Sequence, residues 1–313
     1  MNEICAYYHW WSHKGEVEPH RNLSTPIVLS IATLRAVSDI PIIVIDLSEK
    51  DMDWKDYPKK LNFKVIRKNF YLEKYQSKIK GYRHLSRIFD LQEHYMKNTD
   101  VMYVDSDVFF FKDPLPLKES TDKFCWNLWN TGFFYYNPEK NIEFFELFKH
   151  YTMSAIHSID IRNIFKKYIS YDSSWYGVCD EMVLGYMRAF NSEFFNKIQV
   201  EEHATFFNLF GKKSPKMIHL NWFMIINPIN QSTNANGLFC LYAEELYENI
   251  CKVLTKEDLI QIFGEPILNH CSYKRFNMEK NIHKFIKMKR NQGNLPIHID
   301  EILKKANKLI ALN

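Results

Sequence analysis

Residues 101–114 read VMYVDSDVFFFKDP, and this stretch decides the fold. An apolar run of four residues ends at Asp105-Ser106-Asp107, and a second apolar run follows at once. Short apolar runs rich in β-branched and aromatic residues are typical of buried strands. The two aspartates between these runs need partners, because an unpaired buried charge is costly. The stretch therefore predicts two buried strands with an acidic site where they meet.

A divalent cation is the simplest partner for the two aspartates, because Mg²⁺ and Mn²⁺ prefer hard oxygen ligands. In an extended backbone, alternation places Asp105 and Asp107 on one side and Ser106 on the other, so that both carboxylates converge on one ion. A strand-end turn with two solvated aspartates is the alternative. The strongly apolar strands on either side favour the metal site.

The composition indicates a soluble globular protein of one large α/β domain or two smaller ones. The chain has 313 residues, of which 46% are apolar and 25% charged. A net charge of +4 without a basic, aromatic-interleaved run does not indicate nucleic-acid binding. The six cysteines form no C-x-x-C pair, which argues against zinc and for reduced thiols. Neither a signal peptide nor an apolar run of 18 residues is visible, so we expect a cytoplasmic location.

Strands alternate with helices in the first half of the chain, which predicts an α/β fold with a mixed, mostly parallel central sheet flanked by helices. The predicted strands are 3–8, 41–45, 63–66, 101–104, 108–111, 123–126, 133–136 and 217–220. The predicted helices are 24–38, 79–96, 138–148, 156–168 and 181–190, and residues 51–60 form a polar connection. Surface helices follow at 243–254, 256–263 and 299–312. We therefore expect a main domain over 1–226 and a mainly helical C-terminal extension over 227–313 packed on it.

Two groups elsewhere in the chain could complete a site with the aspartates. His219 lies at the end of a predicted strand, where a lone histidine is commonly a hydrogen-bonded core residue. Beside two carboxylates it becomes a candidate third ligand, since imidazole and carboxylates together suit Mn²⁺. Asp180 and Glu181 open a predicted helix, where the dipole favours acids and where a catalytic carboxylate can also face a cleft. Both interpretations of these acids stay open.

Cationic and amide side chains supply further candidates. Arg83 and Arg87 are four residues apart on one predicted helix and so share a face. This face is either solvated and basic, or it binds a diphosphate or ribose. Asn130 stands between two aromatic runs, where it is either part of a turn or the polar group of a sugar pocket. The basic loop 211–216 either closes over phosphates or is simply exposed.

Taken together, these residues resemble the GT-A glycosyltransferases, whose Rossmann-like fold binds nucleotide-diphospho-sugars. Within that fold the chain is most similar to glycosyltransferase family 8, which includes glycogenin and bacterial lipopolysaccharide galactosyltransferases. The resemblance covers about residues 3–222 and rests on four elements in order: Leu85-Ser86-Arg87 before the D-x-D strand, Asn130-Thr131-Gly132 before an apolar strand, Asp180-Glu181 opening a helix, and a strand ending in His219. The family has Gly and then Lys-Pro-Trp after its histidine, whereas this chain has Leu220-Asn221-Trp222. A lysine for the diphosphate must come from elsewhere, such as the 211–216 loop, or be missing.

The resemblance implies a role for each candidate residue. Mn²⁺ (or Mg²⁺) would be held by Asp105, Asp107 and His219, and would carry the diphosphate of a UDP-sugar. The transferring sugar would be held by Asp180 and Glu181, the catalytic pair, and Glu181 occupies a position that is usually Gln in the family. The donor-binding residues would be Tyr7 or Tyr8 near the uracil, Arg83 and Arg87 near the diphosphate or sugar, Asp105 near the ribose, Ser106, and Asn130 at the sugar.

The implied activity is transfer of a hexose from UDP-glucose, UDP-galactose or UDP-GlcNAc to a hydroxyl of a glycan, protein or lipid. Family membership implies retention of anomeric configuration, whereas inversion follows if Asp180 or Glu181 deprotonates the acceptor as general base. The main domain, 1–226, would be catalytic. One alternative is a catalytically silent sugar- or nucleotide-sugar-binding protein of the same fold, and another is a nucleotidyltransferase, whose Gly- and Arg-rich phosphate loop is not seen. The basic stretch 279–312 is either a solvated face or a peripheral contact with an anionic membrane.

Overall fold

The computed structural model describes residues 3–11, 27–94, 99–114, 125–126, 132–137, 139, 141–165, 178–193, 201–202, 217–219 and 248–263. Its centre is a seven-stranded sheet in the order β3-β2-β1-β4-β7-β6-β8. The strands are β1 (Glu3–Trp10), β2 (Ile42–Asp46), β3 (Lys64–Arg67), β4 (Thr99–Val104), β6 (Cys125–Trp126), β7 (Phe133–Tyr136) and β8 (Glu201–Glu202). Two further strands, β5 (Val108–Phe110) and β9 (Met217–His219), form a separate antiparallel pair.

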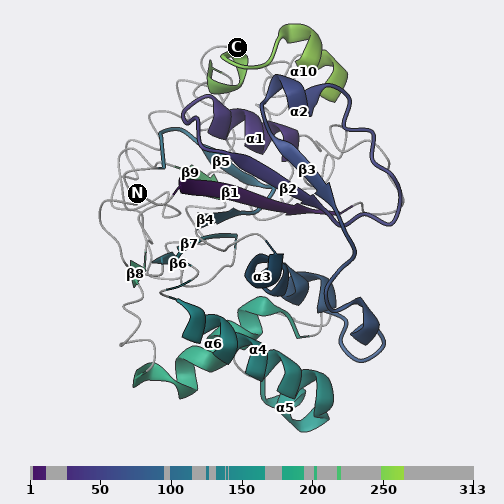
Figure 1. Ribbon diagram of the computed structural model, residues 1–313, viewed down its shortest axis with the longest axis vertical. Helices are drawn as coiled ribbons and strands as arrows, with labels where there is room; N and C mark the ends of the chain where they lie inside the picture. The colour runs from purple at the N-terminus through teal and green to yellow at the C-terminus, as the bar shows by residue number, and fades with distance from the viewer. Residues whose placement is uncertain are drawn as a thin grey trace, which may run out of the picture.

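The central sheet is mixed and mostly parallel. Strands β3, β2, β1 and β4 run parallel, β7 is antiparallel to both β4 and β6, and β8 is parallel to β6. Parallel neighbours require crossover connections, and the helices that make them cover both faces of the sheet (Figure 1). This arrangement confirms the predicted α/β class with a mixed, mostly parallel sheet flanked by helices.

Alternation along β1 divides the core into two layers. Ala6, Tyr8 and Trp10 pack on one face with α1 (Ile27–Arg35), whereas Cys5 and Tyr7 pack on the other. Four helices cover this second face, as Figure 1 shows: α3 (Tyr82–His94), α4 (Ile142–His157), α5 (Ile159–Phe165) and α6 (Asp180–Phe190). Side chains of a strand alternate between faces, so a β1 buried on both faces reads as a continuous apolar run.

Several element bounds differ from the predicted ones. β1 continues to Trp10 rather than ending near residue 8, α3 begins at Tyr82, and α4 runs from Ile142 to His157 instead of ending near residue 148. The predicted polar connection 51–60 contains a short helix, α2 (Tyr57–Lys60), which has proline in its first turn, where the missing N–H costs nothing. A 3₁₀ turn, Glu73–Tyr75, was also not predicted. Predicted helix 299–312, the basic stretch 279–312 and loop 211–216 lie outside the described residues.

The described C-terminal segment packs on the N-terminal part of the chain. Helix α10 (Lys256–Phe263) contacts α2 through an ion pair between the Lys60 ammonium and the Asp258 carboxylate at 2.5 Å. Asn249 donates from its amide to the Phe110 carbonyl at 3.3 Å, and Leu254 is buried in the same core layer as α1. No helix within the described ranges has the length and apolar character that crossing a membrane requires.

A capping box at the start of α10 leads to the first prediction. The Asp258 carboxylate accepts from the backbone N–H of Thr255 at 2.8 Å, and the Thr255 hydroxyl accepts from the Asp258 N–H at 3.2 Å. We expect Asp258→Asn to lower the free energy of unfolding by about 1 kcal/mol, since a cap and an ion pair are both weakened. Equilibrium urea unfolding at pH 7 measures this.

The pH dependence of the same pair checks the cause. Burial raises the pKa of Asp258, but the hydrogen bonds from Lys60 and Thr255 lower it more, so the net pKa lies below its usual value. A carboxyl with a depressed folded pKa stabilises the fold above its unfolded pKa, and this stabilisation is lost as the pH falls through the folded pKa. The difference between wild type and Asp258→Asn should therefore shrink below about pH 4. A difference that stays constant down to acid pH contradicts the assignment.

Candidate functional site

The candidate site lies at the carboxyl edge of the parallel strands. The chain passes from β1 outward to β2 and β3, then crosses back to place β4 on the other side of β1. Open α/β sheets bind ligands outside the carboxyl ends of their strands, at such a reversal of strand order. Asp105-Ser106-Asp107 follows directly after β4 and therefore lies at this point of the fold.

The D-x-D segment is a tight turn, which corrects the expected extended backbone. The Asp105 carbonyl accepts from the Val108 N–H at 3.2 Å, so the chain reverses over residues 105–108 and leaves the sheet. The Asp105 N–H donates to the Gly132 carbonyl at 2.7 Å. Strict alternation therefore does not bring the two carboxylates together. Both aspartates belong to this turn instead. Ser106 and Asp107 are buried in it, and Asp105 is partly exposed.

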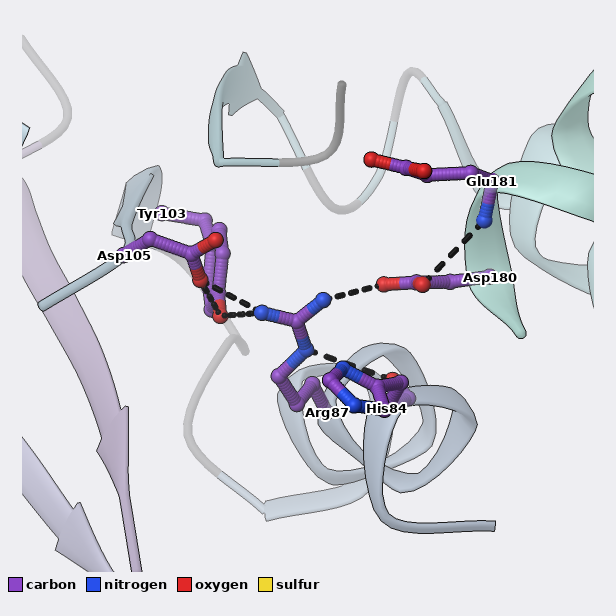
Figure 2. A network of polar contacts seen from close by, with 6 residues as sticks. All are labelled: His84, Arg87, Tyr103, Asp105, Asp180 and Glu181. Carbon is purple, nitrogen blue, oxygen red and sulfur yellow. Dashed lines mark hydrogen bonds and ion pairs between the residues drawn. The ribbon is translucent and has the colours of Figure 1, made fainter. Parts of the chain in front are cut away.

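Arg87 joins the D-x-D turn to the start of α6 (Figure 2). Its Nη1 lies 2.5 Å from Asp105 Oδ1 and its Nη2 lies 2.5 Å from Asp180 Oδ2. The Arg87 side chain is only 7% exposed, and that of Asp180 only 3%. One guanidinium therefore holds two carboxylates from segments that are 75 residues or more apart, which the sequence interpretation of Arg87 as a donor-binding group did not include.

The electrostatics of this group follow from burial and proximity. Burial lowers the pKa of Arg87, but Asp105 and Asp180 raise it more, so its net pKa lies well above the usual value and it stays charged. Tyr103 donates from its hydroxyl to Asp105 Oδ1 at 2.6 Å, and Arg87 donates to the same hydroxyl at 2.9 Å. Burial, chiefly, and the neighbouring Asp105 raise the pKa of Tyr103 well above its usual value. Tyr103 therefore remains a neutral hydrogen-bond donor.

The acid pair at the start of α6 is placed as the sequence predicts. Asp180 is the first residue of the helix, and its Oδ1 accepts from the Glu181 N–H at 3.1 Å. In Figure 2 both carboxylates extend from the helix start toward the side on which Asp105 lies. Burial raises the pKa of the preceding Cys179 thiol to about 12, so this cysteine is not a nucleophile at neutral pH. Cys5 is also buried, with its Sγ 3.7 Å from the Ala6 carbonyl oxygen, whereas Cys251 is exposed.

The structure brings two distant segments to the D-x-D turn by backbone pairing. In the β5–β9 pair, His219 is the register partner of Val108, the residue after Asp107. Gly132, which follows the predicted Asn130 in sequence by two residues, contacts the turn through its carbonyl. The side chain of His219 and the whole of Asn130 lie outside the described residues, so their predicted roles stay predictions.

Three predicted donor-binding residues contact other parts of the structure, although Tyr7 and Tyr8 are the register partners of Tyr103 and Val104. Tyr7 and Tyr8 are in the middle of β1 rather than at its end, and they are 2% and 0% exposed. Tyr8 instead lies within 3.3 Å of the Ser30 hydroxyl in the core. Arg83 pairs with the exposed Glu49 at 3.3 Å and covers the ring of Phe70. The shared helix face that the i,i+4 spacing predicted therefore has one buried and one partly exposed arginine.

Sequence reasoning missed Tyr103 and His9 as members of the site's surroundings. Tyr103 lies two residues before Asp105, so alternation along β4 could have placed it on the side that faces α3. His9 follows Tyr7 by two residues in β1, and its ring lies 5.6 Å from the ring of Tyr103. The signal for His9 was present in the sequence, but the underestimated length of β1 hid it.

The D-x-D turn offers carboxylate oxygens, the ligand type that Mg²⁺ and Mn²⁺ prefer. Asp105 and Asp107 supply two carboxylates there, and Asp105 also pairs with Arg87. Within the described residues, which do not include the His219 side chain, no three His, Cys, Asp or Glu side chains are assembled into a metal site.

Comparison with known proteins finds likeness in structure alone. No family model matches the sequence, and no curated protein does. Among solved structures, a bifunctional glycosyltransferase, WbbM, aligns at a TM-score of 0.45 and 10% identity over 84% of this chain, but the match spans only about half, 52%, of WbbM. The galactosyltransferase LgtC, in complex with donor and acceptor sugar analogues, aligns at 0.45 and 13% over 80% of this chain and 96% of LgtC. Mouse xyloside xylosyltransferase 1 aligns at 0.39 and 11% over 70% of this chain and 97% of its own. Likeness of this extent does not place the chain in a family.

Proposed function

We propose that this protein is a metal-dependent GT-A glycosyltransferase that transfers a hexose from a UDP-sugar to a hydroxyl acceptor. The observation that carries the proposal is the Arg87 bridge between Asp105 and Asp180 at the strand-order reversal. It joins an acidic turn to an acidic helix start at the edge where α/β sheets bind nucleotides. A transferase for a nucleotide-diphospho-sugar needs both parts, one for the diphosphate and one for the sugar.

Asp105 and Asp107, with His219, would hold Mn²⁺ or Mg²⁺ at the turn. The bound cation would supply stabilisation of the negative charge that develops on the departing diphosphate. Asp105 already accepts from Tyr103 and Arg87, which fix the orientation of its carboxylate. Arg87, a fixed and buried cation beside this turn, would add to the field at the leaving group.

Asp180 and Glu181 would act on the sugar. Asp180 is held by Arg87 and by the Glu181 N–H, so it is a rigid acceptor suited to the hydroxyls of a hexose. The proposed reaction retains the anomeric configuration, whereas it inverts if Asp180 or Glu181 deprotonates the acceptor as general base. The acceptor hydroxyl would belong to a glycan, protein or lipid.

The proposal is tested by hydrolysis and transfer with a panel of UDP-glucose, UDP-galactose and UDP-GlcNAc. We expect turnover of at least one donor with Mn²⁺ and its loss with excess EDTA, restored by adding Mn²⁺ back. A Mn²⁺-dependent thermal shift with UDP, but without turnover of any donor, would instead identify a catalytically silent nucleotide-sugar-binding protein. If the protein neither binds nor turns over any UDP-sugar, the proposal is overturned.

A further inference from the structure

A second group of ionisable side chains is buried directly behind the candidate site. Asp90 lies on α3. Its Oδ1 is 2.6 Å from the Lys68 ammonium, and its Oδ2 is 3.6 Å from His9 Nε2. The side chains of His9 and Asp90 are 0% exposed, and that of Lys68 is 17% exposed. These three residues, the His9–Lys68–Asp90 cluster, come from β1, the residue after β3, and α3.

The cluster lies beside Tyr103 and shares α3 with Arg87, the two residues that hold Asp105. Asp90 follows Arg87 by three residues on α3, so the two side chains share a face of the helix. The ring of His9 lies 5.6 Å from the ring of Tyr103, whose hydroxyl donates to Asp105. Any shift of α3 against β1 and β4 would therefore move the Arg87 guanidinium relative to the Asp105 carboxylate.

Burying the charged side chains of the cluster in the core costs free energy. A buried carboxylate is costly unless it is paired, and the Lys68 ammonium provides the pairing charge. Both ring nitrogens of His9 and the Oδ2 of Asp90 have no hydrogen-bond partner among the described residues, because 3.6 Å is too long for one. Buried polar atoms without partners are rare in native proteins and commonly mark bound water or a functional constraint.

The environment of His9 keeps its imidazole ring neutral. Burial, chiefly, lowers the pKa of His9, and the positive charges of Arg87 and Lys68 lower it further, against the opposing effect of Asp90. His9 is therefore neutral at pH 7. A protonated His9 would compete with Lys68 for Asp90, whereas the neutral ring leaves Asp90 paired with Lys68.

We propose that His9, Lys68 and Asp90 are positioning residues that lock α3 against β1 and β4 and so fix the Arg87 guanidinium between Asp105 and Asp180. The cluster has no contact with substrate and acts through Arg87 and Tyr103. Its consequence for turnover rests on the proposed function, but its effect on Arg87 does not.

The test compares Asp90→Asn with Asp258→Asn. Both changes neutralise a buried aspartate paired with a lysine, but Asp258 pairs with Lys60 of α2, on the face of the sheet opposite α3 (Figure 1). The readout is the side-chain Nε–H signal of Arg87 in ¹H–¹⁵N NMR spectra, assigned by its loss in Arg87→Lys. We expect Asp90→Asn to shift this signal and to speed its exchange with water, and Asp258→Asn to leave it unchanged.

Turnover of the donor identified above provides the second readout. Asp90→Asn should lower kcat by about 10-fold, as loss of an outer-shell contact commonly does, with little change in the KM for the donor. Asp258→Asn should keep the wild-type kcat. If Asp90→Asn does not fold, His9→Phe, which keeps an aromatic ring but removes the imidazole nitrogens, takes its place.

The outcomes separate the two proposals. An Arg87 signal identical in wild type, Asp90→Asn and His9→Phe shows that the cluster only stabilises the fold, and it overturns the positioning role. A shifted Arg87 signal in a protein that turns over no nucleotide sugar supports the positioning role and counts against the proposed function alone. A kcat equally reduced in Asp258→Asn attributes the loss to general destabilisation and also overturns the positioning role.

Discussion

Replacing Arg87 by methionine is expected to lower the free energy of unfolding by about 3–5 kcal/mol, the cost of breaking a buried ion pair on one side. Methionine keeps much of the side-chain volume but leaves Asp180, 3% exposed, without its cation. Asp105 loses the same partner and keeps the Tyr103 hydroxyl. Urea unfolding followed by far-UV circular dichroism measures the change as a lower midpoint at constant slope.

Arg83→Met is the matched control for this loss. Arg83 lies one turn earlier on the same helix, and its partner Glu49 is 83% exposed. An exposed ion pair contributes about 0–1 kcal/mol, so this change should be nearly neutral apart from the contact with the Phe70 ring. Equal destabilisation by the two variants would show that the Arg87 bridge does not stabilise the fold.

A second substitution tests whether the lost ion pair is the cause. Adding Asp180→Asn to Arg87→Met removes the buried carboxylate that the first change left without Arg87. The double variant should therefore be more stable than Arg87→Met, although Asp180→Asn by itself is destabilising. Such coupling is expected for side chains in direct contact. Additive losses in this cycle contradict the buried ion pair.

Individual strands could be predicted where the residues of the strand alone indicate that it is buried. Apolar runs at residues 41–45, 101–104 and 133–136 identify strands without knowledge of their neighbours, because burial on both faces is encoded locally. The order of these strands in the sheet could not be predicted, because the sequence does not show which strands the crossover connections place side by side. The departure of β5 from the central sheet to pair with β9, 109 residues later by the register of Phe109 with Ile218, has no local signal.

The candidate site was predictable in its parts but not in its contacts. Asp105, Asp180 and Arg87 were each identified from residue type and position, yet their bridge joins segments 93 residues apart and needs the tertiary fold. Tyr7 and Tyr8 show the opposite case. The family resemblance implied that one of them lies near the uracil at the end of the first strand, whereas the structure buries both in the middle of β1. Residue type alone cannot distinguish a ring that packs from one that binds.

Asp107→Asn is expected to lower kcat in the presence of Mn²⁺ by about 10²-fold or more, the cost of losing an electrostatic group that acts on the leaving charge. Asparagine keeps the shape of the side chain and removes one of the negative charges that the turn would offer a divalent cation. Mn²⁺ affinity, followed by electron paramagnetic resonance of the free ion, should fall with it. Excess Mn²⁺ should recover part of the lost rate, since weaker binding is offset by mass action.

Asp113→Asn is the control, because Asp113 is half-buried, follows β5 in the same stretch of sequence, and has no proposed role. It should keep both the wild-type Mn²⁺ affinity and the wild-type kcat. Asp105→Asn should be worse than Asp107→Asn in stability as well as in rate, because it also breaks the pair with Arg87. If Asp107→Asn binds Mn²⁺ and turns over donor like the wild type, the cation is not held at this turn. The negative charge of the D-x-D segment would then serve Arg87 alone.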